Sequence, residues 1–136
     1  MLSTTSESET RSSWRSAEKS GADPAADPVD LAHLRRYTMG DTALEKEVLQ
    51  LFLLQLPVTI GALNDAASNR EWMVAAHTLK GSCRAVGAWR IASLAEHAER
   101  HMADLNSAER REALEGIEEA AGQARAFIDR AYSDIP

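Results

Sequence analysis

Hydrophobic residues recur along most of this chain at steps of three and four, the spacing that gathers side chains on one face of an α-helix. Two stretches show this best, residues 72–86 and 114–128. No segment alternates between apolar and polar residues for long enough to predict a β-strand. The pattern therefore predicts an all-α protein. The apolar positions are Trp72, Ala76, Leu79, Cys83 and Val86 in the first stretch, and Leu114, Ile117, Ala121, Ala124 and Ile128 in the second.

Residues typical of helix ends divide this pattern into elements. Asp27 followed by Pro28 is typical of a helix start and Gly40 of a helix end, which predicts a short first helix. The sequence 42–45 reads as a capping box that opens a long second helix, with Pro57 inside it.

A second capping box, at 68–71, opens the third helix, and Gly87 marks its end. Asn106 or Ser107 caps the last helix. Four long helices with short links pack best as an antiparallel up-and-down four-helix bundle, here with an additional short N-terminal helix. The long helices are predicted at about 42–67, 68–86, 88–105 and 107–131.

Residues 1–26 differ from the rest of the chain. They are polar, with chain breakers near their end, and we expect a flexible N-terminal tail that buries too little apolar surface to order itself. The remaining residues, 27–136, are long enough to form one domain with its own core.

Composition narrows the class of protein. The formal net charge of −6 argues against nucleic-acid binding, which normally needs a basic face. Cys83 is the single cysteine, so no intramolecular disulfide can form. No stretch approaches the ~18 apolar residues of a membrane span, and we expect a cytoplasmic protein without membrane contact.

The third predicted helix carries the most informative polar residues. At about 100° per residue, His77 lies on the side of the helix opposite the apolar stripe. Lys80, Gly81 and Arg84 fall within about 60° of it. The helix is therefore expected to present a histidine, two cations and a position without a side chain to solvent.

This grouping suits phosphoryl chemistry. A neutral imidazole has a ring nitrogen that can attack an activated phosphoryl group, and a cation one turn away, such as Lys80, can reach the phosphate oxygens. Glycine inside a helix costs about 0.5–1 kcal/mol relative to alanine, so Gly81 needs a reason other than helix stability. We interpret it as giving a partner access to His77, and Arg84 as a candidate binding residue.

The sequence Ala76-His77-Thr78-Leu79-Lys80-Gly81-Ser82, followed by Val86-Gly87-Ala88, resembles the signature of the histidine-containing phosphotransfer (HPt) domains of bacterial phosphorelays. The likeness spans about 28–131 and continues in the next helix. There Ile91, Ala95 and Glu99 match an aliphatic, a small and an acidic position of the family pattern.

The resemblance implies a four-helix bundle in which His77 accepts the phosphoryl group, Lys80 stabilises the phosphate and Gly81 allows access. It implies a phosphocarrier without kinase activity of its own, which shuttles phosphoryl groups between receiver-domain aspartates. The implied partners are response-regulator receiver domains and a hybrid histidine kinase. No cofactor is expected in this chain, because the Mg²⁺ belongs to the receiver domain, and we expect a monomer.

Two other functions stay open on the sequence. One is the dimerising phosphoacceptor hairpin of a histidine kinase, although an acid usually follows the histidine there and a proline comes soon after, where this chain has Thr78 and Gly81. The other is a helical adaptor that has lost phosphotransfer, although His77, Lys80 and Gly81 are all intact.

Three further features have plain structural interpretations. His97 and His101 are four residues apart but have no third ligand nearby in the sequence, so we expect a solvated helix face and no metal site. Cys83 is expected to fill the core. The apolar run Leu51–Leu54 is either covered by the core and the first helix or partly exposed beside His77 as a docking patch.

Overall fold

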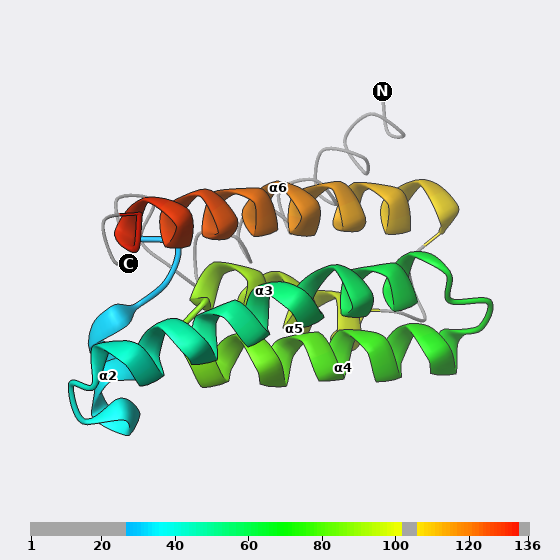
Figure 1. Cartoon of the computed structure of the whole chain (residues 1–136). Helices are drawn as coiled ribbons and strands as arrows, with labels where there is room; N and C mark the ends of the chain where they lie inside the picture. The colour runs from blue at the N-terminus through cyan, green and yellow to red at the C-terminus, as the bar shows by residue number, and fades with distance from the viewer. Residues whose placement is uncertain (1–26, 102–105, 134–136) are drawn as a thin grey trace.

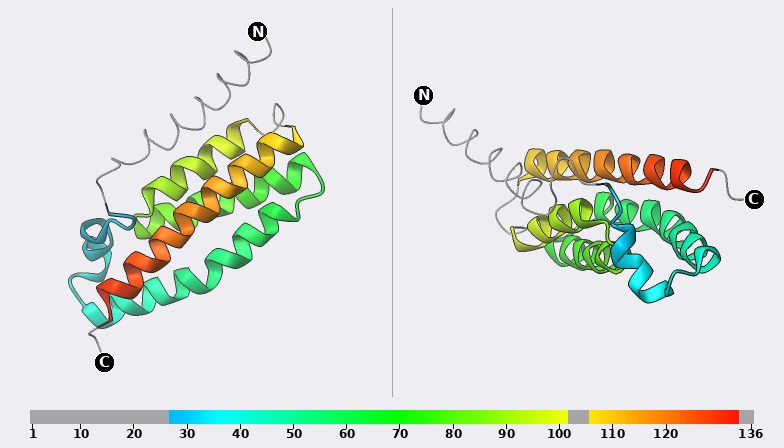
Figure 2. Two further views of the ribbon diagram at one scale, coloured as in Figure 1. Left: turned by 90° about the horizontal axis from the view of Figure 1, so that it is seen from above. Right: turned by 90° about the vertical axis from the view of Figure 1, so that its left-hand side faces the viewer.

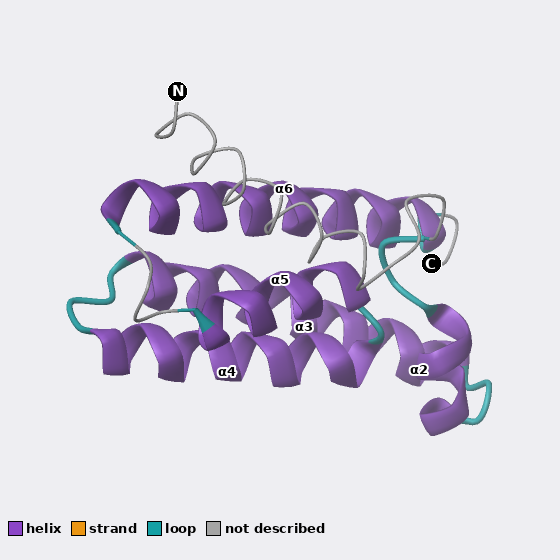
Figure 3. Ribbon diagram, turned by 180° about the vertical axis from the view of Figure 1, so that it is seen from behind, coloured by secondary structure: helices purple, strands orange, loops and turns teal. Residues whose placement is uncertain are grey.

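The computed structural model describes residues 27–101 and 106–133, and every regular element among them is an α-helix (Figure 3). The predicted tail, residues 1–26, lies outside the described residues. Four long helices run alternately up and down, and the short α2 (Leu31–Thr38) lies at one end of the bundle beside the start of α3 (Thr42–Asn64) (Figure 1). The predicted all-α bundle with a short N-terminal helix is confirmed.

Helix α2 spans Leu31–Thr38 and begins three residues later than the sequence predicted. Its cap is Asp30, whose carboxylate accepts a hydrogen bond from the backbone N–H of His33 at 3.1 Å. The backbone N–H of Asp30 donates to the carbonyl of Gly87 at 2.9 Å. Val29 is fully buried. The chain before α2 is thus fixed by tertiary contacts that local capping rules do not include.

Helix α3 spans Thr42–Asn64 and is capped by Asp41, which accepts from the N–H of Leu44 at 3.1 Å. The predicted capping box at 42–45 is wrong, because Glu45 is buried and pairs with Arg35 of α2 at 2.7 Å. The helix ends at Asn64, three residues earlier than predicted. The N–H of Ala67 already donates to the Glu71 carboxylate at the start of the next helix.

Pro57 lies inside α3 and has no N–H to donate to the carbonyl of Leu53. Arg125 of the last helix, α6 (Ser107–Ala131), donates a side-chain hydrogen bond to this carbonyl at 3.1 Å. The Leu53 carbonyl that Pro57 leaves without a helical partner thus forms a hydrogen bond that links α3 to α6.

The next three helices agree more closely with the prediction. Helix α4 spans Asn69–Val86, and Ser68 accepts from the N–H of Glu71 at 3.1 Å, as the capping box requires. Helix α5 spans Trp89–Arg100 and ends at the cap residue His101, about five residues earlier than the predicted end near 105. Helix α6 spans Ser107–Ala131 and is capped by Asn106.

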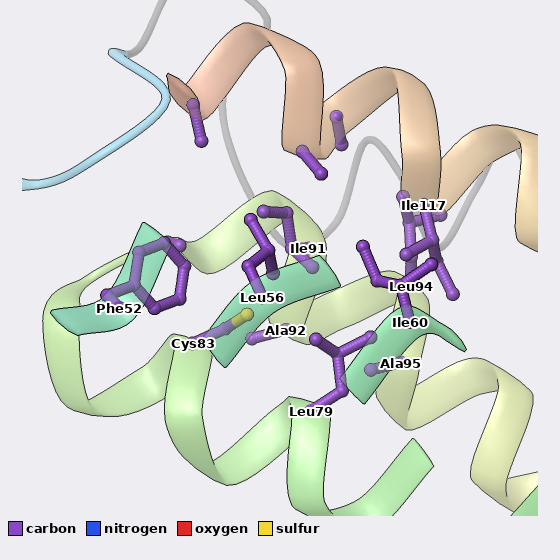
Figure 4. Close-up of a cluster of buried hydrophobic side chains, with 14 of the residues drawn as sticks. Phe52, Leu56, Ile60, Leu79, Cys83, Ile91, Ala92, Leu94, Ala95 and Ile117 are labelled. Atoms are coloured by element: carbon purple, nitrogen blue, oxygen red, sulfur yellow. The ribbon is translucent and has the colours of Figure 1, made fainter. Parts of the chain in front are cut away.

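The core fills the space between these helices. Helix α6 lies along the face formed by α3 and α5, and α4 covers the opposite face of the same pair (Figure 2). Figure 4 shows side chains from all four long helices meeting in this space. The indole N–H of Trp72 is satisfied there by the carbonyl of Ala98 at 3.0 Å. Buried members include Phe52, Leu56, Ile60, Trp72, Leu79, Cys83, Ile91, Leu94, Ala95 and Ile117.

Among the described residues, one helix is long and apolar enough by composition to cross a membrane. This is α3, and 28% of its most apolar 18-residue window is buried. The expectation that no stretch approaches membrane-span composition is therefore wrong for this helix. A core helix of a soluble protein has the same composition, and α3 packs against α2, α4 and α6 in the bundle.

Candidate functional site

Helix α4 exposes His77 on its outer side. The flanking residues Ala76 and Leu79 are buried, whereas the His77 side chain is 68% exposed. Because α4 lies diagonally opposite α6 in the bundle, its outer side faces away from that helix (Figure 2). The imidazole is therefore open to an approaching molecule.

Glu99, on the neighbouring helix α5, holds the imidazole in place. One carboxylate oxygen lies 2.9 Å from Nδ1 of His77. The other lies 2.8 Å from Nζ of Lys80. One acidic side chain from α5 thus bridges the histidine and the lysine of α4.

The charge of Glu99 decides which nitrogen of His77 is free to react. Partial burial raises the pKa of Glu99, but its hydrogen bonds with Lys80 and His77 and their charges outweigh this, and the net pKa is lowered. The carboxylate is therefore ionised at neutral pH and can only accept hydrogen bonds. A neutral His77 must then carry its proton on Nδ1 and keep the lone pair on Nε2.

Lys80 is less exposed than the sequence predicted. Its side chain is only 15% exposed, because it turns toward α5 to pair with Glu99. The helical spacing places Lys80 at the border between the outer side of α4 and its contact with α5. The expectation of a freely solvated cation beside His77 is wrong in this respect.

Gly81 lies one turn after His77 on the exposed side. A Cβ atom built there would have no heavy atom within 4 Å, apart from its own helix backbone and chain neighbours. No packing contact therefore requires glycine at this position.

Arg84 also lies on the outer side of α4, with a side chain that is 49% exposed. Its guanidinium pairs with Glu96 of α5 at 3.2 Å. The same oxygen of Glu96 accepts from Arg100 at 3.2 Å. The structure thus places Arg84 two turns from His77, in an ion pair of its own.

An exposed apolar surface lies on α3 and α4. Part of the predicted run is covered, since Phe52 is buried, but Leu51 and Leu54 are 57% and 67% exposed. The run is therefore partly covered and partly exposed, and a docking role for its exposed residues stays a prediction. We call the exposed apolar residues Leu51, Leu54 and Val58 of α3 and Val74 of α4 the apolar patch.

Two features of the site were missed by reasoning from the sequence. Glu99 was noted as an acid in the family pattern, but its contact with His77 depends on how two helices cross, 22 residues apart in the chain. His97 and His101 were expected on a solvated face, whereas both are partly buried with ring centroids 4.4 Å apart. Burial, then the charges of His101 and Arg100, lower the pKa of His97 to about 4.

Comparison with protein families gives one result that covers most of the bundle. Comparisons with curated proteins and with solved structures give no significant match. The family model of the Hpt domain matches residues 47–129, more than half of the chain, and this range contains His77, its partner Glu99 and the four long helices except their outermost ends. The chain therefore belongs to the Hpt domain family, whose members act in phosphotransfer in two-component signalling.

Proposed function

We propose that this protein is a phosphocarrier that takes a phosphoryl group from a receiver-domain aspartate onto Nε2 of His77 and passes it to the aspartate of another receiver. The observation that carries the proposal is the geometry at His77. The ring is exposed, and Glu99 holds its Nδ1 so that Nε2 points away from that contact with its lone pair available.

The aspartate and His77 account for every bond and charge that changes in the transfer. Nε2 attacks the phosphorus of the aspartyl phosphate, the P–O bond to the aspartate breaks, and the aspartate leaves as a carboxylate. The proton stays on Nδ1, so the phosphorylated ring becomes cationic. Glu99, 2.9 Å away, offsets this new positive charge. The reverse reaction delivers the phosphoryl group to the next aspartate.

Lys80 and Gly81 support this step in different ways. Lys80 neutralises Glu99 on its far oxygen and keeps the carboxylate ionised and oriented toward His77. Lys80 lies one turn from the ring, so its ammonium group is also close enough for the phosphate-stabilising role that the family resemblance implies. Gly81 leaves room beside His77 for the partner's active site.

The apolar patch is the proposed docking surface for the receiver domain. Exposed apolar groups on two adjacent helices are typical of interaction sites, because removing their surface from water on binding is favourable in free energy. The Mg²⁺ of the reaction comes with the receiver. We further propose a cytoplasmic monomer, in which the four long helices close one core without a second copy of the chain.

The test is transfer of labelled phosphate from receiver domains phosphorylated with acetyl phosphate and Mg²⁺. We expect acid-labile, base-stable label on the wild-type protein and none on His77→Gln. His101→Gln is the matched control, because it removes another partly exposed histidine and should keep the label. Circular dichroism of each sample checks that both variants fold. Label retained by His77→Gln overturns the proposal.

A further inference from the structure

A cluster of three charged residues lies beyond the contacts of His77 and is not used by the proposed phosphotransfer. In this cluster one oxygen of Glu96 of α5 lies 3.2 Å from Arg84 of α4, with which it forms an ion pair, and also accepts a hydrogen bond from Arg100 of its own helix at 3.2 Å. Two guanidinium groups share one carboxylate, so the cluster keeps a net positive charge. The Arg84 and Arg100 side chains are 49% and 70% exposed, and we call these three residues the Arg84 cluster.

The Arg84 cluster lies on the side of the molecule that a partner of His77 must approach. Arg84 follows His77 by seven residues, which places it within about 20° around the helix axis and about 10.5 Å along it. A protein interface of ordinary size easily spans this distance. Arg84 therefore falls within the reach of a domain docked on His77, at the edge of the contact.

The two helices that carry the cluster are basic in an acidic protein. Together α4 and α5 contain five lysines and arginines against three acidic residues, whereas the whole chain has a net charge of −6. Helix α6, on the far side of the bundle, contains four arginines against six acidic residues. The two helices that carry His77 and Glu99 thus have a net positive charge, whereas α6 has a net negative one.

A receiver domain brings complementary charge to this surface. Its active site must hold Mg²⁺ beside a phosphorylated aspartate, and magnesium is bound through carboxylates, so acidic residues surround the reacting phosphoryl group. We propose that Arg84 is a specificity-determining residue that binds a carboxylate at the rim of the receiver's active site. In the free protein Glu96 holds Arg84 in place of that carboxylate. The inference rests on the proposed phosphotransfer.

The shared carboxylate makes this exchange of partners easy. When Arg84 leaves Glu96 for the receiver, Arg100 still neutralises Glu96, so no unpaired acid remains. Because Arg84 and Glu96 are only partly buried, the pair between Arg84 and the receiver carboxylate should add little to binding affinity. It should add more to the rate and selectivity of association. Charges at an interface rim typically act in this way.

The experiment compares four proteins, each first phosphorylated with phosphoramidate and then mixed with a panel of receiver domains in Mg²⁺. Arg84→Gln should lower kcat/KM for transfer to receivers that have a rim carboxylate by about 3- to 10-fold at low salt, mainly through KM. Glu96→Gln should raise it by about 2- to 3-fold, because Arg84 is no longer held. Arg111→Gln, which removes an exposed arginine from α6, is the matched control and should behave as wild type.

Two further results make the assignment specific. The effect of Arg84→Gln should shrink as salt is raised, and it should vanish when the rim carboxylate of the receiver is itself replaced by an amide. Opposite signs for Arg84→Gln and Glu96→Gln distinguish a docking role from a merely structural ion pair, whose two halves would change transfer in the same direction. Equal transfer by Arg84→Gln and Arg111→Gln overturns the inference alone. Absence of transfer from the wild-type protein to every receiver overturns the proposed function as well.

Discussion

Two glycines, one inside α4 and one directly after its last residue, show how differently the two parts of this molecule are built. Gly81 lies on the open side of α4, where an added Cβ would meet nothing within 4 Å. Gly87 ends the helix with φ of +82°, and an added Cβ would lie 2.8 Å from the backbone oxygen of Asp30. One glycine borders empty space and the other is enclosed by the chain.

The surroundings of the two glycines explain the contrast. At the α4–α5 turn, Asp30 bonds to Gly87 through its backbone and to the indole of Trp89 through its carboxylate, at 2.9 and 3.0 Å. The start of α2 is thereby attached to the bundle. Around His77 the described residues leave the side of α4 uncovered. The close contacts at the α4–α5 turn stabilise the fold, whereas the exposed side of α4 leaves His77 accessible to a reacting partner.

The largest expected effect is on stability at the enclosed glycine. Gly87→Ala should lower the free energy of unfolding by about 3 kcal/mol, since a left-handed backbone costs a residue with Cβ about 1–2 kcal/mol and the contact with Asp30 forces a backbone shift. Chemical denaturation measures this. Gly116→Ala in α6, where a Cβ has open space, is the control and should leave stability level or raised. A loss below ~1 kcal/mol for Gly87→Ala would show that the turn is not enclosed.

The open glycine should give the opposite result. Gly81→Leu is expected to slow transfer from a phosphorylated receiver by about 100-fold, because a side chain one turn from His77 separates the reacting groups. The melting temperature should stay level or rise, since helix-interior glycine is unfavourable. Labelling by phosphoramidate, which needs no docking surface, should fall less. Normal transfer from a receiver would remove the access role of Gly81.

The sequence predicted the outline of this contrast and not its cause. Apolar residues spaced three and four positions apart suffice to separate the buried side of α4 from the side that carries His77. The capping residues predict most of the helix ends. Glu99 and the partial burial of Lys80 depend on the crossing of α4 and α5, which a pattern within one helix does not contain. The start of α2 likewise depends on Gly87, 57 residues after Asp30.

Lys80 lies between the buried part of the bundle and the exposed side of α4, so its replacement should affect both stability and phosphotransfer. Lys80→Ala should slow transfer about tenfold, because Glu99 loses the charge that keeps it ionised and oriented. It should also lower stability by about 0.5–1 kcal/mol, because a pair with a mostly buried lysine is broken.

The pH dependence identifies the cause of the Lys80 effect. The lowered pKa of Glu99 keeps its carboxylate ionised in the folded protein, and this contribution is lost as the pH falls through that pKa. Without Lys80 the pKa of Glu99 should rise, because the carboxylate loses its nearby positive charge. Carbon-13 NMR of the Glu99 side-chain carboxyl at several pH values, in wild type and in Lys80→Ala, measures this shift. An unchanged Glu99 pKa would mean that Lys80 does not act through Glu99.

The smallest expected effect concerns a histidine on the structural side. Burial lowers the pKa of His97 to about 4 from its usual value of 6.5, so folding favours the neutral ring. Between these two values the unfolded chain binds a proton that the folded protein does not, and stability falls as the pH falls. His97→Gln should flatten this decline in a urea titration at several pH values. Because His97 is only partly buried, its share should be well below the ~1.4 kcal/mol per pH unit of a full proton. An unchanged slope would show that His97 is solvated.

The central claim is that phosphate is carried on Nε2 of His77 while Glu99 holds Nδ1. The most direct measurement is ¹H–¹⁵N NMR of the ring nitrogens of ¹⁵N-labelled protein after treatment with phosphoramidate. Of the four histidines, His77 alone should change, with Nε2 bonded to phosphorus and a proton retained on Nδ1. Phosphate on another histidine, or on Nδ1 of His77, would contradict the claim.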